Sequence, residues 1–177
     1  DRTSRGLGDV YKRQIFYLEK GYKISEIATF SKFFGVFATI VGGFIGGYCS
    51  YKFGTMKALF FGAFIAALSN LLFAWLAVSP TSVNFLITVI TADNISSGFA
   101  GAAFVIYLSG LTSIKFTATQ YALFSSIMLF LPKLIAGYAG SWVDIMGYAY
   151  FFSFTAFLGI PVLVLIIWIG KVAPIKN

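Results

Sequence analysis

Five long runs of apolar residues constrain the fold of this chain more than any other feature. They extend over Phe33–Tyr51, Ala58–Val78, Val83–Leu111, Tyr121–Trp142 and Tyr148–Gly170. A helix needs about 20 apolar residues to cross the roughly 30 Å hydrocarbon core of a bilayer, so each run is long enough. Hydrophobic residues make up 59% of the chain and charged residues 11%, which leaves too little polar surface to cover a soluble domain. The sequence therefore predicts an all-α integral membrane protein.

The ends of the chain differ from this apolar middle. Ile15–Leu18 reads as the end of one more helix, so we expect five full transmembrane helices plus a truncated sixth in one domain over residues 15–171. Residues 1–14 are polar and hold 4 of the 13 basic residues, and we expect them to be a non-native, linker-derived segment. Residues 172–177 are expected to form a cytoplasmic tail. The chain is accordingly expected to be the C-terminal piece of a longer protein.

The composition excludes several classes of function. The chain has no His and one Cys, Cys49, so zinc sites, disulfide frameworks and Ser-His-Asp or Cys-His nucleophile systems are not expected. We therefore expect no metal, no cofactor and no enzyme. The net charge is +7, but the basic residues are scattered through the loops, so no nucleic-acid partner is expected. The expected surroundings are a lipid bilayer.

The lysines in the loops indicate an orientation. With five full spans, one side of the membrane receives Lys52, Lys57, Lys115, Lys171 and Lys176. The other side receives Lys20, Lys23 and Lys32, partly offset by Glu19, Glu26 and Asp144. Positively charged loops stay in the cytoplasm, so the C-terminus is predicted to be cytoplasmic.

Two ionisable residues, Asp93 and Lys133, lie deep within spans. Each costs roughly 2.5–3.5 kcal/mol at the centre of a membrane helix, so neither should face lipid. At about 1.5 Å per residue they lie about 15 Å and about 13 Å from the outer surface, on consecutive antiparallel helices. Either they pair and hold two helices in register, or both point into a polar cavity. Asn94 and Ser97 beside the aspartate, and Ser126 two turns before the lysine, favour the cavity.

Small residues repeat at a spacing of four where helices should touch. The pairs are Gly42 with Gly46, Gly43 with Gly47, Gly98 with Ala102, and Gly137 with Ser141, and Gly101 lies close by. This spacing is typical of close helix packing in membranes, and a mobile or water-lined interface is the alternative. Pro132 directly precedes Lys133 and predicts a kink at the level of that charge.

Several stretches resemble the C-terminal half of AmpG-type muropeptide permeases of the major facilitator superfamily. The most specific are ADN (92–94), GAAFVIYLSGL (101–111), FTATQYALFSS (116–126) and GSWVD (140–144). The resemblance implies that the five spans are the eighth to twelfth helices, of which the eighth, tenth and eleventh line the cavity while the ninth and twelfth face lipid. YCSYKFGTMK (48–57) resembles the superfamily's cytoplasmic loop motif, with Gly54 in place but Tyr51 where an acidic residue is usual.

The activity that this resemblance implies is proton-coupled import of anhydromuropeptides, through the bacterial inner membrane, for cell-wall recycling. Its partners would be a small anionic solute, a proton and the missing N-terminal half. Lys133 would bind a substrate carboxylate and Asp93 a proton or a polar substrate group. Further hydrogen bonds would come from Asn94, Ser97, Tyr107, Gln120 and Ser126. Alternatives are a facilitator for another anion such as acetyl-CoA, and a structural membrane subunit without transport.

Overall fold

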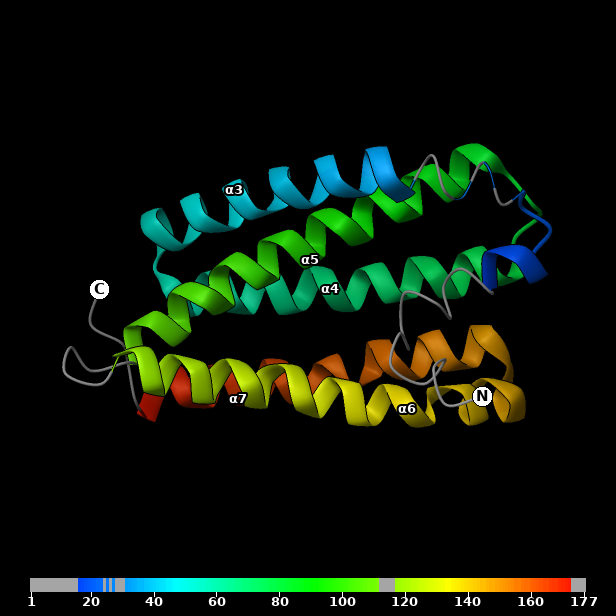
Figure 1. Cartoon of the computed structure of the whole chain (residues 1–177). Helices are drawn as coiled ribbons and strands as arrows, with labels where there is room; N and C mark the ends of the chain where they lie inside the picture. The colour runs from blue at the N-terminus through cyan, green and yellow to red at the C-terminus, as the bar shows by residue number, and fades with distance from the viewer. Residues whose placement is uncertain (1–15, 24, 26, 28–30, 112–116, 173–177) are drawn as a thin grey trace.

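The computed structural model describes residues 16–23, 25, 27, 31–111 and 117–172, and within residues 117–140 it describes only part of the side chains. These residues form helices and short turns, and no strand occurs among them. The elements are a helical turn at 16–19, η1 (Ser31–Gly35), α3 (Val36–Phe53), α4 (Thr55–Val78), α5 (Val83–Leu111), α6 (Thr117–Phe157) and α7 (Gly159–Val172). The long helices form one bundle, in which α5 runs obliquely across α4 (Figure 1).

Four helices in the described part of the chain are long and apolar enough to cross a membrane. They are Lys32–Phe53, Thr55–Val78, Val83–Leu111 and Ser141–Val172. An all-α membrane architecture is thus confirmed. The predicted span Tyr121–Trp142 falls within the first part of α6, where most side chains lie outside the described residues. The expected total of five full spans and a truncated sixth stays a prediction.

A single glycine divides α6 into two helical segments. Gly147 has φ 77° and ψ 163°, and the ribbon turns back there, so that Tyr148–Phe157 begins the last span (Figure 1). The predicted runs Tyr121–Trp142 and Tyr148–Gly170 left five residues between them, but the helix continues to Met146 and the turn is made at Gly147. The positive φ explains the position of the turn, because glycine adopts this conformation without the strain that a side chain would add.

The last span contains a second, smaller break. It runs from Tyr148 to Phe157, passes Leu158, and continues as α7 from Gly159. Pro161 has no N–H to donate to the carbonyl four residues earlier, which accounts for a break at this level. None of the residues of α7 is buried, as expected for a helix that faces lipid.

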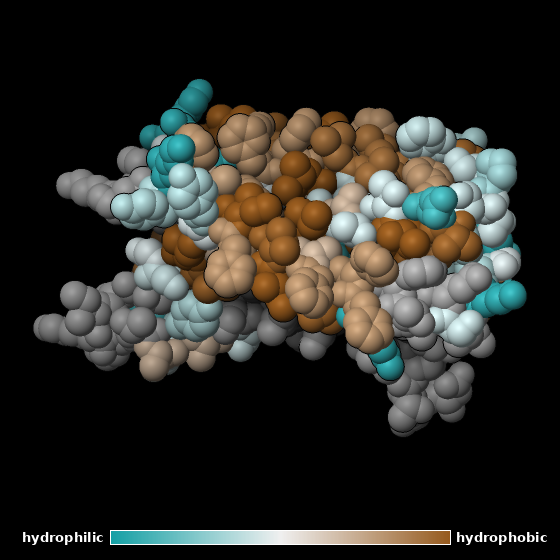
Figure 2. All heavy atoms as spheres, turned by 90° about the horizontal axis from the view of Figure 1, so that it is seen from above, coloured by the Kyte–Doolittle hydropathy of each residue, from teal (hydrophilic) through white to brown (hydrophobic). Residues whose placement is uncertain are grey.

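Two apolar clusters hold the helices together. The larger cluster joins residues of the 16–27 region to α4, α5 and the start of the last span: Phe16, Tyr17, Tyr22, Ile27, Phe73, Leu76, Leu86, Val89, Ile90 and Phe152. The smaller cluster, Ala58, Leu59 and Ala103, lies near the opposite ends of α4 and α5. On the face seen in Figure 2, apolar atoms cover the middle and hydrophilic residues gather toward both ends, the pattern expected for a protein that crosses a bilayer.

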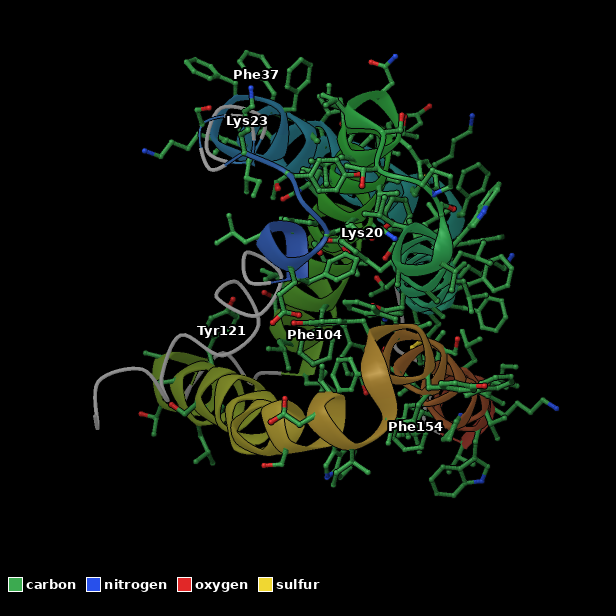
Figure 3. All side chains as sticks on the ribbon, turned by 90° about the vertical axis from the view of Figure 1, so that its right-hand side faces the viewer. Lys20, Lys23, Phe37, Phe104, Tyr121 and Phe154 are labelled. Atoms are coloured by element: carbon green, nitrogen blue, oxygen red, sulfur yellow. The ribbon has the colours of Figure 1, made fainter. Side chains whose placement is uncertain are left out.

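The helix α4 has a buried side and an exposed side. The resemblance indicated a helix that faces lipid, and the exposed apolar residues Phe61, Leu68 and Trp75 agree with this on one side. The helix also lies between α5 and the last span (Figure 3) and contacts both. One side of α4 is buried from Thr55 to Leu76, including Gly62 and Ser69. Only its other side is available to lipid.

Candidate functional site

Close contact between α3 and α5 fixes the position of the polar residues in α5. A Cβ added at Gly42 would collide with the Ile95 carbonyl, and one at Gly46 would lie 2.5 Å from the Phe99 carbonyl oxygen. From the other side, a Cβ on Gly98 would collide with the Thr39 carbonyl. The two backbones touch only because these three positions lack side chains.

The other glycines of the predicted repeats are less crowded. A Cβ at Gly43 would lie 3.9 Å from the Gly98 carbonyl oxygen, whereas Gly47 and Gly101 have nothing within 4 Å. The spacing of four therefore picked out two pairs on α3. Of these, Gly42, Gly43 and Gly46 lie against α5, with the Gly43 backbone nitrogen beside Gly98. Gly54 acts differently: at φ 92° it forms the whole connection between α3 and α4.

Asp93 is 6% exposed and lies on the side of α5 that meets α4. The Ser69 hydroxyl of α4 donates a hydrogen bond to Asp93 Oδ1 at 3.2 Å. The same hydroxyl lies 2.8 Å from the Ala66 carbonyl oxygen, one turn earlier in α4. A carboxyl group that would be costly in lipid is thus enclosed between two helices and given a hydrogen-bond donor.

Asn94, the next residue, points toward α3 instead. Its Nδ2 donates to the Ile90 carbonyl at 2.8 Å, and Thr39 Oγ1 donates to its Oδ1 at 3.1 Å. Its amide also lies against Gly35, where an added Cβ would be 3.4 Å from Nδ2. Adjacent polar residues of α5 are therefore shared between two neighbouring helices.

Ser97 is exposed, in contrast to these two residues. At 100° per residue, positions 93, 97 and 104 fall within about 40° of one another on the helix surface. The labelled side chain of Phe104 lies between α5 and α6 (Figure 3). Ser97 and Phe104 thus lie toward the side where α6 runs, within about 40° around the helix of Asp93, which meets α4.

The other predicted site residues are more dispersed. Tyr107 packs against the smaller apolar cluster, and the centroid of its ring lies 6.2 Å from the centroid of the Phe104 ring. Ser126 is exposed, and its hydroxyl donates to the Ala122 carbonyl at 2.7 Å. Gln120 is half-buried near the start of α6. Lys133, Pro132 and Gly137 belong to the helical backbone of α6, but their side chains or surroundings lie outside the described residues.

Sequence reasoning missed Ser69 and Thr39, the partners of Asp93 and Asn94. The only available signal for Ser69 was its place beside Asn70 in the middle of an apolar run. Among the described residues no group of His, Cys, Asp or Glu could hold a metal ion. What the described residues provide is a protonatable carboxyl with hydroxyl and amide neighbours, enclosed by apolar helices. Such a site can accept a proton or bind a polar group of a solute.

Known proteins resemble this chain over most of its length. The protein named "Putative transporter AmpG 4" from Rickettsia felis is 38% identical over 156 residues, which cover 88% of this chain and 38% of that protein. The Rickettsia conorii protein of the same name is 38% identical over 155 residues, covering 88% and 37%. "Putative transporter AmpG 1" from Rickettsia bellii is 34% identical over 152 residues, covering 86% and 37%.

No family model matches the chain. The chain spans a little over a third of the length of the curated relatives it matches, 38% of the first and 37% of the next two. The matches agree with the resemblance seen in the sequence motifs, and the apolar helices agree with proteins that move solutes through membranes. The chain is thus a multi-pass membrane protein related to the AmpG-type transporters.

Proposed function

We propose that this chain is the cavity-lining C-terminal half of a major facilitator transporter that imports anhydromuropeptides together with protons. The observation that carries the proposal is the buried carboxyl of Asp93, enclosed in the middle of an apolar span in a relative of named transporters. An ionisable residue inside a membrane span is by default a candidate for a solute or proton pathway. The proposed location is the bacterial inner membrane, with the C-terminus in the cytoplasm.

The chemistry of the solute supports the division of roles. Muropeptides carry peptide carboxylates and an amino sugar, so a cation in a cavity of low dielectric would attract them. In this proposal Lys133 binds a carboxylate of the solute and Asp93 carries the coupled proton. Hydrogen bonds to the sugar and peptide would come from Asn94, Ser97, Tyr107, Gln120 and Ser126. Ser97 is the best placed of these, because it is exposed on the face of α5 that it shares with Asp93.

The glycine contacts support a mechanism in which α3 and α5 move as one body. Their backbones meet at Gly42, Gly46 and Gly98, so sliding one helix past the other would force side chains into backbone. In facilitators one half rocks against the other around a site near the midplane. A stiff half with its polar residues at mid-depth fits that mode of transport.

Uptake by the full-length parent protein in proteoliposomes tests the proposal. Radiolabelled anhydromuropeptide should accumulate when the interior is alkaline relative to the bath, and unlabelled muropeptide should compete. Without the gradient, accumulation should fall to equilibration. If a correctly folded protein shows no uptake of muropeptide under either condition, the substrate assignment is wrong, and acetyl-CoA is the next anion to test. Uptake at the same rate and to the same level with and without the proton gradient would instead overturn the proton coupling.

A further inference from the structure

The contact between Ser69 and Asp93 gives α4 a role that its sequence did not indicate. We propose that Ser69 is a positioning residue that holds the Asp93 carboxyl at the α4–α5 interface. This inference rests on the proposed function for its transport readout, but not for its structural one. It makes α4, which packs against both α5 and the last span, part of the proposed proton pathway.

The argument begins with the single proton of the Ser69 hydroxyl. Two oxygen atoms lie within its reach, the Ala66 carbonyl oxygen at 2.8 Å and Asp93 Oδ1 at 3.2 Å. A serine hydroxyl donates one hydrogen bond and accepts up to two. It can therefore donate to only one of these oxygens at a time. The acceptor depends on whether the Asp93 carboxyl carries a proton.

Both protonation states of Asp93 can keep the contact. When the carboxyl is ionised, the hydroxyl donates to it, and this charge-assisted bond is the stronger of the two available. When the carboxyl is protonated, its O–H can donate to Ser69 Oγ while Ser69 donates to the Ala66 carbonyl oxygen. The hydroxyl only has to rotate. Ser69 can thus hold the carboxyl in place while a proton arrives and leaves.

Most charged residues on the described helices around α5 lie far from the middle of the membrane span. Of the charged residues on the helices around α5, the following lie near helix ends: Lys32, Lys52, Lys57, Asp144 and Lys171. Lys133 of α6 is the one basic residue that the sequence places at the depth of Asp93. Ser69 is 4% exposed, so water cannot readily replace its hydroxyl.

Ser96 offers a matched control. It is 6% exposed, it belongs to the same interface, and its hydroxyl lies 2.7 Å from the Ala92 carbonyl oxygen and 3.4 Å from that of Ile65. Replacing Ser96 by Ala removes a buried hydroxyl between α4 and α5 without removing a hydrogen bond to Asp93. Any effect that S69A has and S96A lacks therefore reports on the carboxyl rather than on packing.

The test uses the full-length parent in lipid and two readouts. The first is the infrared band of the Asp93 carboxyl, assigned by its loss in D93N. We expect S69A to shift this band, S96A to leave it in place, and S69T, which keeps a hydroxyl, to restore it. The second is gradient-driven uptake, for which we expect S69A to lower the maximal rate about tenfold with little change in KM, as for one lost hydrogen bond to a charged group.

The two readouts separate the possible failures. If the wild-type protein takes up no muropeptide, the proposed function fails, and the infrared comparison still decides the role of Ser69. If the band assigned to Asp93 is the same in wild type and S69A, the positioning role is overturned. Equal losses of uptake in S69A and S96A would also overturn it, because the effect would then come from packing alone.

Discussion

The Tyr22 hydroxyl bonds the backbone of Ser82 twice, since it donates to the Ser82 carbonyl at 3.1 Å and accepts from the Ser82 amide at 3.2 Å. The two residues are 60 positions apart in the chain. Lys20 strengthens the same attachment, because its Nζ donates to the Ala77 carbonyl at 2.7 Å. The turn after residues 16–19 is thus fixed to the α4–α5 connection, which forms one end of the bundle.

Replacing Tyr22 by Phe should loosen this end. Tyr22 is 4% exposed, so the ring would stay buried while both hydrogen bonds are lost. The Ser82 carbonyl keeps the bond that it accepts from the Leu86 amide at 3.0 Å, and the Ser82 amide becomes the unpaired group. We expect the free energy of unfolding to fall by about 1–2 kcal/mol, measured by denaturant titration of the full-length protein in mixed micelles.

A neighbouring contact provides the control for Tyr22. Thr81 Oγ1 donates to the Lys20 carbonyl at 3.0 Å, but this bond is exposed. T81A should change the free energy of unfolding by no more than about 0.5 kcal/mol, because water replaces the lost partner. If T81A lowers the free energy of unfolding as much as Y22F does, the two hydrogen bonds of Tyr22 are not what stabilises this end of the bundle.

The glycines of α3 allow a sharper test of helix packing. G46A places a methyl group 2.5 Å from the Phe99 carbonyl oxygen, so α3 and α5 would have to separate. G47A, one position along, meets nothing within 4 Å. We expect G46A to lower the free energy of unfolding by about 1–3 kcal/mol. G47A should be neutral or stabilise by up to about 1 kcal/mol through its higher helix propensity. Similar values for both variants in the same titration would contradict the close contact.

The length of the helices could be predicted from the sequence, because the bilayer requires long apolar runs. The predicted run Val83–Leu111 coincides with α5. The ends were harder to predict where lysines flank a turn. The predicted runs left the six residues from Lys52 to Lys57 between them, but Gly54 alone connects α3 to α4. Lysine is a good helix former, so charge marks the membrane surface and not the helix end. Positive φ at Gly54 and Gly147 determines where the helices end.

The site could be predicted in part. A carboxyl in an apolar run is expected to be enclosed by protein. Asp93 is enclosed in this way, since its side chain is buried. The hydrogen bond from Ser69 could not be predicted, because the rotation of α4 about its axis depends on packing along the whole helix. The run Ala58–Val78 is apolar on all sides, and its sequence does not mark the face that Gly62 and Ser69 turn toward α5. Only the assembled helices bring Ser69 to Asp93.

The orientation can be tested by labelling cysteines from one side. The α4–α5 connection holds Pro80, which is exposed, and the start of α6 holds Thr119, also exposed. In a cysteine-free parent that includes C49S, we expect a membrane-impermeant maleimide to label P80C in intact cells. T119C should react only after the membrane is permeabilised. The reverse pattern would place the C-terminus outside and contradict the positive-inside prediction.

The role of Lys133 is best tested by comparing Ala with Arg. If Lys133 binds a substrate carboxylate, K133A should raise KM for anhydromuropeptide at least about tenfold, since a hydrogen bond to a charged group is worth roughly 1.5–3 kcal/mol. K133R should retain tight binding, because a guanidinium can hold a carboxylate with two parallel hydrogen bonds where an ammonium supplies a point charge. Uptake kinetics in proteoliposomes measure both. If K133A transports with unchanged KM and rate, the cation does not anchor the solute, and the pairing of Lys133 with Asp93 becomes the better account of why both charges lie at one depth.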